Sequence, residues 1–184
     1  MKFININKVA DGKYLKKYEL TYENKAGKTK TYEIASRKEL KNAEDLGKRV
    51  SGVSVVAIKE DKIVLLHEFR MAVNRKIYNL IAGMIEKDET IEDCIYREVY
   101  EETGLRVTKV RRILRPSYSA VGISDTKTYI AFVEVDGEIA DHTSDNEEIE
   151  AAFYTREDVA RMLETEDFSS RAQIVACFFS ENMI

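Results

Sequence analysis

The sequence has no tryptophan, one proline and two cysteines among its 184 residues, and it contains no long apolar run. Because no stretch of about 18 apolar residues occurs, we expect no membrane-spanning segment, and residues 1–5 do not resemble the start of a signal peptide. Cys94 and Cys177 lie far apart in helical contexts, which favours small buried apolar residues over a disulfide or a metal-binding pair. These absences indicate a cytoplasmic protein with no membrane partner.

The sequence also lacks an excess of basic residues, since 29 lysines and arginines stand against 33 acidic residues and the formal net charge is −4. Such a chain has no basic field to hold the phosphate backbone of a nucleic acid, so we expect no nucleic-acid partner. Hydrophobic residues make up 44% of the chain and charged residues 34%, which is typical of a globular protein with a buried core. The length predicts one domain with a small extension.

The first part of the chain is predicted to be this extension. Residues 14–23 alternate between polar and apolar side chains, which is the period of a half-buried strand, and the apolar side carries Tyr18, Leu20 and Tyr22. A turn-like segment then leads into residues 29–34, which are rich in β-forming residues, so we expect an antiparallel hairpin. We assign residues 1–45 to the extension and residues 46–184 to the main domain.

The main domain shows both strand and helix periodicity. Residues 53–58 form a continuous apolar run, which predicts a strand covered on both faces, and a polar turn leads from it to a second apolar run that should pair with it. Including that second run, further strands are expected at residues 63–66, 77–81, 107–114, 128–135 and 149–154. Helical periodicity occurs at residues 90–103, 155–164 and 169–182. The fold class is therefore α/β, with helices against both faces of a mixed sheet and an N-terminal antiparallel β extension.

The helix expected at residues 90–103 carries a cluster of like charges. Glu98, Glu101 and Glu102 are spaced i, i+3 and i+4, so their carboxylates project from one face and repel each other. The nearest helical cation, Arg97, is spaced to pair with Glu101 or Asp93. A hard divalent cation such as Mg²⁺ would balance the cluster and would also bridge to substrate phosphates. An ordinary solvated helix face is the alternative, and the spacing alone does not decide between them.

Residues around this helix match a longer pattern, GMIEKDETIEDCIYREVYEETGL, over positions 83–105. This segment resembles the Nudix box, Gly-x5-Glu-x7-Arg-Glu-apolar-x-Glu-Glu-x-Gly-apolar, with every fixed position filled. The resemblance implies a Nudix-type α/β/α sandwich over about residues 50–182. It also implies that Mg²⁺, or Mn²⁺ as a substitute, is bound by the carboxylates of Glu98, Glu101 and Glu102 and the backbone carbonyl of Ala82.

The same resemblance assigns supporting roles to other positions in the segment. Arg97 is expected to pair with a glutamate of the box and to orient it, and Gly83 is expected to allow a close approach of the backbone. Glu89 is expected to hold the loop that precedes the helix. Thr90 and Asp93 resemble a capping box at the start of the helix, and Gly104 suits the left-handed position just past its end.

The flanking sequence is similar to the ADP-ribose pyrophosphatase branch of this family. Glu68-Phe69-Arg70 stands where that branch has a Gln-Tyr-Arg-like segment, which implies that Phe69 and Arg70 contact substrate and that Arg70 clamps a phosphate. The chain departs from the branch at Val121, which replaces a proline within residues 118–125. It also departs at Asn79 and Ile81, where the branch has Glu-x-Pro-Ala-Gly. These departures affect the choice of substrate and leave the phosphate chemistry intact.

The resemblance also implies a function and a general base. The expected reaction is Mg²⁺-dependent hydrolysis of the pyrophosphate bond of ADP-ribose or a related nucleoside diphosphate sugar, giving a nucleoside monophosphate and a sugar phosphate. A metal-bound water attacks in line, and the acidic segment 144–150 supplies the acceptor of its proton, with Glu148 as first choice and Glu147 as second. An ordinary solvated loop is the alternative for that segment.

Three other readings of the chain stay open. Dinucleoside polyphosphates and nucleoside triphosphates are alternative substrates within the enzyme class. A nucleotide-binding module without activity is the alternative outside that class, although the complete set of glutamates argues against it.

The extension is expected to form a homodimer, because a two-stranded ribbon must pack on another surface and relatives use such extensions in this way.

Overall fold

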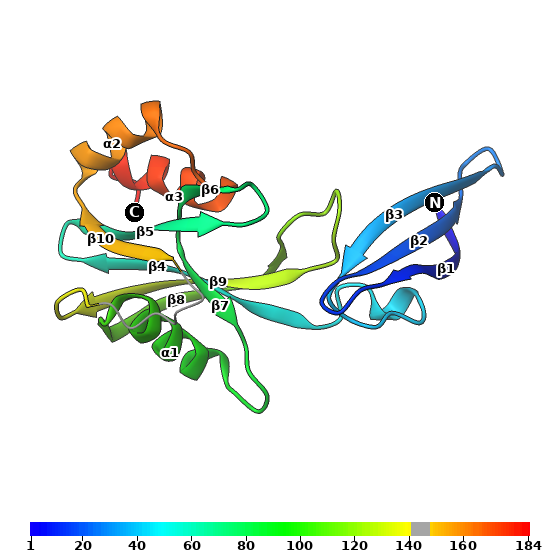
Figure 1. Ribbon diagram of the computed structural model, residues 1–184, viewed down its shortest axis with the longest axis horizontal. Helices are drawn as coiled ribbons and strands as arrows, with labels where there is room; N and C mark the ends of the chain where they lie inside the picture. Colours follow the sequence, from blue (N-terminus) through cyan, green and yellow to red (C-terminus); the bar gives the residue numbers. More distant parts are fainter. Residues whose placement is uncertain (141–147) are drawn as a thin grey trace. The chain divides into compact units, whose positions relative to one another are not determined.

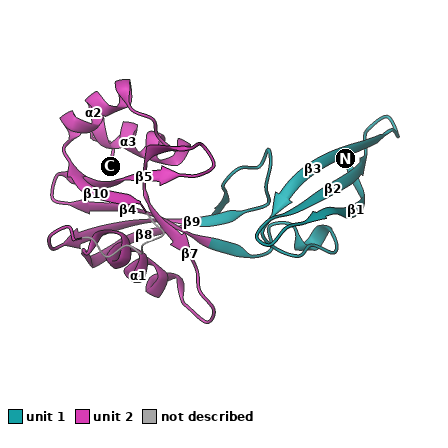
Figure 2. Ribbon diagram, viewed as in Figure 1, with its two compact units in different colours: residues 1–51, 116–128 teal, residues 52–115, 129–184 magenta. Residues whose placement is uncertain are grey.

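A computed structural model describes residues 1–140 and 148–184, and the chain divides into two compact units (Figures 1 and 2). The first unit comprises residues 1–51 and 116–128, and the second comprises residues 52–115 and 129–184. The expected boundary between residues 45 and 46 therefore lies inside the first unit. The segment 116–128 joins that unit through long-range hydrogen bonds, such as Ala35 N–H to the Ile123 carbonyl at 2.8 Å.

The first unit contains a three-stranded antiparallel sheet in the order β1–β2–β3, followed by a short 3₁₀ helix, η1. Its elements are β1 (Lys2–Asp11), β2 (Lys16–Glu23), β3 (Thr29–Ser36) and η1 (Ala43–Asp45). The expected hairpin is present as β2 and β3, which pair in register with Leu20 opposite Tyr32. The expectation of a two-stranded ribbon is wrong, because β1 adds a third strand. Two register shifts in β1 break the period of two that would have revealed it.

The apolar side of β2 is covered within the chain. Tyr18 and Leu20 belong to a buried cluster with Ile34 and Leu40, and Phe3 of β1 packs against it. The Tyr18 hydroxyl accepts a hydrogen bond from the Leu40 N–H at 3.0 Å, so the polar end of this buried ring is satisfied. A partner chain is therefore not required to cover these side chains. The homodimer stays a prediction.

Within the described residues, a seven-stranded mixed sheet has the order β10–β5–β4–β9–β8, with β6 paired to β5 and β7 paired to β4. Its strands are β4 (Val50–Lys59), β5 (Lys62–Arg70), β6 (Arg75–Asn79), β7 (Ile81–Met84), β8 (Arg106–Tyr118), β9 (Lys127–Asp136) and β10 (Ile149–Tyr154). The single strand expected at 77–81 is instead two strands, divided at Leu80. The Asn79 side chain accepts a hydrogen bond from the Leu80 N–H at 2.9 Å, a local contact that competes with the strand ladder.

Helices cover both faces of this sheet, as Figure 1 shows for α1 on one side and for α2 and α3 on the other. The helices are α1 (Ile91–Thr103), α2 (Arg156–Thr165) and α3 (Ser170–Ser180). Alternate residues of β4 explain the arrangement, because Val55 packs in a cluster with Ile95 of α1, whereas Val56 packs with Phe179 of α3. The expected α/β/α sandwich is confirmed.

Each of these helices is preceded by an N-cap residue whose side chain accepts a backbone hydrogen bond, namely Thr90, Thr155 and Ser169. These caps satisfy N–H groups that the first helical turn leaves free, and they explain why the predicted helix starts agree with the structure to within one residue. None of the helices in the described residues combines the length and apolar composition that a membrane crossing requires.

Candidate active site

The segment 83–105 folds as a loop, a helix and a second loop, as expected. The Thr90 hydroxyl oxygen accepts a hydrogen bond from the Asp93 N–H at 3.1 Å and begins α1. Gly104 follows the helix at φ 74°, and its N–H donates to the Tyr100 carbonyl. In the loop before the helix, the Glu86 N–H donates to the Glu89 carboxylate at 2.9 Å, so the expected role of Glu89 in holding this loop has a physical basis.

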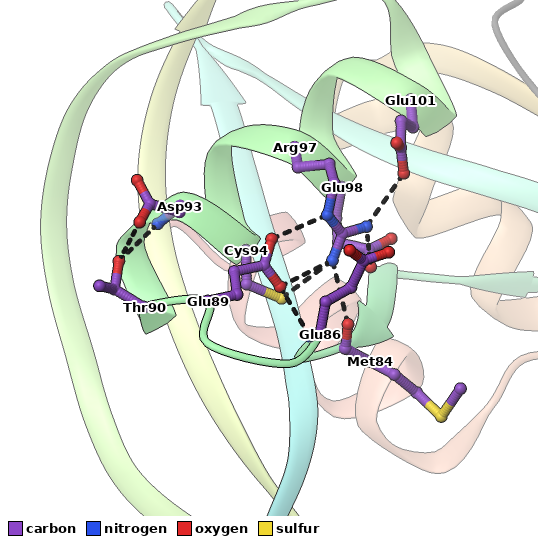
Figure 3. A network of polar contacts seen from close by, with 9 residues as sticks. All are labelled: Met84, Glu86, Glu89, Thr90, Asp93, Cys94, Arg97, Glu98 and Glu101. Atoms are coloured by element: carbon purple, nitrogen blue, oxygen red, sulfur yellow. Dashed lines mark hydrogen bonds and ion pairs between the residues drawn. The ribbon is translucent and has the colours of Figure 1, made fainter.

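Arg97 is the centre of a polar network that joins the loop to the helix (Figure 3). Its guanidinium donates to Glu89 at 2.8 Å, to Glu98 at 2.7 Å and to Glu101 at 3.0 Å. It also donates to the Met84 carbonyl at 3.0 Å, which ties the end of β7 to α1. Helical spacing correctly indicates Glu101 as a partner but does not show Glu89, because the loop brings Glu89 back to the helix from eight residues away.

The alternative pairing of Arg97 with Asp93 is absent from the contacts of these two described residues. The Asp93 carboxylate accepts a hydrogen bond from the Thr90 hydroxyl at 2.6 Å instead. This contact keeps the Asp93 side chain at the start of α1, one turn from Arg97. The Arg97 guanidinium therefore pairs with Glu89, Glu98 and Glu101.

In this network, pairing with Arg97 lowers the pKa of a carboxyl group, whereas burial raises it. Hydrogen bonds from Arg97 lower the pKa of Glu89 from 4.5 to about 2, so its carboxylate is ionised at neutral pH. Contacts with Glu89, Glu98 and Glu101 raise the pKa of Arg97 above its ordinary value. Glu98 is only 7% exposed, and burial raises its pKa even though Arg97 acts to lower it. A positive charge nearby therefore stabilises the ionised form of Glu98.

Gly83 lies where the Glu98 carboxylate meets the backbone of β7. A Cβ atom at position 83 would stand 1.7 Å from Cδ of Glu98, so the carboxylate occupies the space that any other residue would fill. This observation gives the physical reason for the close approach expected at Gly83. Gly52 on β4 is a second such position that sequence reasoning missed, because its Cβ would stand 2.0 Å from the Gly83 carbonyl oxygen.

The expected metal ligands come from two elements. Glu98, Glu101 and Glu102 lie on α1, and Ala82 lies on β7, where its N–H donates to the Glu102 carboxylate at 3.0 Å. Among the described residues no group of three His, Cys, Asp or Glu side chains converges on one point. In the network, one nitrogen of Arg97 holds one oxygen of Glu98 and one of Glu101.

The donor types nevertheless fit a hard divalent cation. The second carboxylate oxygens of Glu98 and Glu101 receive no hydrogen bond from the described residues. The Glu101 side chain is 52% exposed, so it is free to turn toward an ion without disturbing the core. Carboxylate and carbonyl oxygens are the ligands that magnesium prefers, so the chemistry of the set agrees with the expected ion.

The expected substrate and base residues lie at the ends of β5 and β10. The Arg70 guanidinium donates to the Glu68 carboxylate at 3.2 Å, and Phe69 is partly exposed. The Phe69 N–H donates to the Glu148 carbonyl at 3.0 Å, so the structure brings these expected residues together. The Glu148 carboxylate pairs with Lys76 at 3.1 Å, a contact that the sequence did not suggest. Glu147, the second choice for the base, lies outside the described residues.

Asn79, one of the departures from the ADP-ribose pyrophosphatase pattern, contacts Glu68 of the segment before the box. The Asn79 amide donates to the Glu68 carboxylate at 2.5 Å. Val121 is exposed and belongs to the first unit. Ile81 is fully buried in the core cluster that contains Ile95 of α1, which accounts for an apolar residue there.

The family model of the NUDIX domain matches residues 48–176. The chain belongs to the Nudix family. This range contains the loop–helix–loop segment and the strands that hold it, so the family and the geometry point to the same site.

Two relatives of this Nudix protein are named NAD-capped RNA hydrolase NudC. The protein from Photobacterium profundum is 47% identical over 64 residues, which is 34% of this chain and 23% of that protein. The protein from Mycobacterium tuberculosis is 34% identical over 108 residues, which is 53% of this chain and 30% of that protein. The chain thus spans less than a third of the length of these relatives.

A solved structure resembles the Nudix protein over nearly its whole length. It is the crystal structure of ADP compounds hydrolase, which matches with a TM-score of 0.75 over 99% of this chain and 92% of the other. The sequence identity is 19%, so this likeness shows the fold.

Proposed function

We propose that this protein hydrolyses the pyrophosphate bond of ADP-ribose, or of a related nucleoside diphosphate sugar, and releases a nucleoside monophosphate and a sugar phosphate. The observation that carries the proposal is the complete Nudix box, folded as loop, helix and loop around Arg97. An ADP-containing substrate is supported by the fold shared with ADP compounds hydrolase and by the Glu68-Phe69-Arg70 segment.

The reaction as proposed uses a divalent metal ion, as Nudix hydrolases generally do. Glu98, Glu101, Glu102 and the Ala82 carbonyl would hold it, and Mg²⁺ is the ion of choice, with Mn²⁺ as a substitute. A bound ion supplies positive charge to the phosphoryl oxygens and makes a water molecule more acidic. Arg97 keeps two of these carboxylates in place through hydrogen bonds at 2.7 and 3.0 Å.

The remaining steps belong to side chains at the end of β5 and the start of β10. Arg70 is half exposed, so its guanidinium can bind a substrate phosphate, and Phe69 beside it offers an exposed apolar ring. Glu148 accepts the proton of the attacking water, and Lys76 holds its carboxylate in the absence of substrate. Glu147 is the alternative acceptor.

A second candidate substrate follows from the relatives. These relatives are named for NAD-capped RNA. NAD carries the same AMP–diphosphate linkage as ADP-ribose. Cleavage of NAD would therefore use the same site with a different leaving group. The chain has no excess of basic residues to hold RNA, so we favour the free small molecule.

A panel of substrates with matched variants tests the proposal. Rates with Mg²⁺ are measured for ADP-ribose, GDP-mannose, NAD, NAD-capped RNA, a dinucleoside polyphosphate and a nucleoside triphosphate. We expect ADP-ribose or another diphosphate sugar to be cleaved fastest, with activity lost in Glu102→Gln and kept in Glu92→Gln, an exposed glutamate of the same helix. Tight binding of ADP-ribose without cleavage of any compound would instead support a nucleotide-binding module.

A further inference from the structure

Glu68 is a carboxylate in an unusual position, because it is only 7% exposed although it lies near the end of β5. Both of its carboxylate oxygens have partners. One accepts the Asn79 amide at 2.5 Å, and the other accepts the Arg70 guanidinium at 3.2 Å. A buried carboxylate is costly unless it is paired and hydrogen-bonded, so both contacts are needed to keep Glu68 in place.

The orientation of Asn79 is determined by its other contacts. Its side-chain oxygen accepts hydrogen bonds from the Ser169 hydroxyl at 2.6 Å and from the Leu80 N–H at 2.9 Å, so its amide nitrogen must face Glu68. Ser169 is also the N-cap residue just before α3, and its N–H donates to the Tyr78 carbonyl at 2.9 Å. Glu68 is thus connected through Asn79 to the start of a helix that packs on the core.

Arg70 is held on one side only. A guanidinium has five N–H donors, and the described residues use one of them, the contact of NH1 with Glu68. The Arg70 side chain is 55% exposed, so the other donors are accessible to a ligand. A phosphate that approaches this side can form the paired hydrogen bonds that arginine makes with anions, while Glu68 keeps the opposite side fixed.

We propose that Glu68, anchored by Asn79 and Ser169, is a positioning residue that holds Arg70 ready to bind a substrate phosphate. This inference rests on the proposed function, in which Arg70 contacts the diphosphate. Ordering one long side chain on binding costs an amount of free energy that corresponds to roughly 2- to 13-fold in affinity. Glu68 removes most of that cost before the substrate arrives.

Glu68 could either position Arg70 or compete with the substrate phosphate for it, and the two roles predict opposite effects on binding. If its negative charge merely competed with phosphate for Arg70, then neutralising it would strengthen substrate binding. If it positions Arg70, then neutralising it weakens binding and leaves the chemical step almost unchanged. The effect must also depend on Arg70, because Glu68 acts through that side chain.

The experiment compares wild type with Glu68→Gln, Arg70→Ala and the double variant. It measures the Kd of ADP-ribose by calorimetry without metal, and KM and kcat with Mg²⁺. We expect Glu68→Gln to raise Kd and KM about tenfold with kcat within about twofold of wild type, and we expect the double variant to bind no worse than Arg70→Ala. Glu134→Gln, which removes a carboxylate paired with Arg111 on the same sheet, is the control and should leave Kd unchanged.

Several results would overturn the inference. Unchanged or tighter binding by Glu68→Gln refutes it, as does an effect of the same size in the Arg70→Ala background. Asn79→Ala provides a second variant that keeps Glu68 but removes its anchor, and it should raise Kd in the same direction. The calorimetric series is independent of turnover, so ADP-ribose that binds without being cleaved would refute the proposed function alone. Absence of binding by wild type to ADP-ribose and to the other nucleoside diphosphate sugars would refute both.

Discussion

Replacing Gly83 by alanine should damage both the stability and the activity of this protein. The new Cβ would stand 1.7 Å from Cδ of Glu98, whereas ordinary contacts begin near 3.4 Å. The Glu98 carboxylate must therefore move by about 2 Å, because the backbone of β7 is held by its pairing with β4. That movement breaks the 2.7 Å hydrogen bond to Arg97 and leaves a buried carboxylate without its cation.

The structure allows the size of this effect to be worked out. A hydrogen bond to a charged group contributes about 1.5–3 kcal/mol, so we expect a loss of roughly 2 kcal/mol in the free energy of unfolding. In a chain of this length, that loss corresponds to a decrease of about 4–8 °C in Tm. Because Glu98 is also a proposed metal ligand, a displacement larger than 1 Å should lower kcat at least about 100-fold.

Thermal unfolding and a pyrophosphohydrolase assay check these values. Gly122→Ala is the control for stability, since a Cβ at that position meets nothing within 4 Å, and its Tm should equal that of wild type. A Gly83→Ala protein with unchanged Tm and with activity within twofold of wild type would refute the reasoning from this contact.

Three other predictions follow from the site and the extension. Hydrogen bonds from Arg97 lower the pKa of Glu89 from 4.5 to about 2, so the stabilisation is complete above pH 4.5 and is lost as the pH falls toward 2. Glu89→Gln should therefore lower Tm at pH 7, and its difference from wild type should shrink below pH 4.5; a constant difference would contradict this. Glu102→Gln should abolish most Mg²⁺ binding, measured by calorimetry, without unfolding the chain, and near-normal Mg²⁺ affinity would remove Glu102 from the ligand set. Light scattering of the full chain at micromolar concentration should give twice the chain mass of 21.2 kDa, and a monomer would exclude residues 1–45 as a dimerisation element.

Local periodicity was sufficient to predict most of the fold. Apolar runs and helix caps are local signals, so the hairpin of β4 and β5 and the start of α1 could be located from a few neighbouring residues. Strand β1 was missed because its register shifts interrupt the alternation. The place of residues 116–128 in the first unit depends on contacts with residues about 90 positions away, which no local pattern reveals.

The candidate site shows the same division between local and distant information. The spacing of Glu98, Glu101 and Glu102 indicated one helix face, and the resemblance to the Nudix box indicated that Gly83 allows a close approach. The contact between Glu89 and Arg97 depends on the path of a loop, and the contact between Glu68 and Asn79 depends on the pairing of β5 with β6. Such contacts follow from the folded chain and are not encoded by residue spacing.

Product analysis by chromatography is the most direct test of the proposed function. The protein is incubated with ADP-ribose and Mg²⁺, with Glu102→Gln as the matched control. We predict that wild type yields AMP and ribose 5-phosphate in equal amounts and that the variant yields neither at a comparable rate. Release of pyrophosphate from a nucleoside triphosphate, with ADP-ribose and other diphosphate sugars left intact, would contradict the proposed substrate.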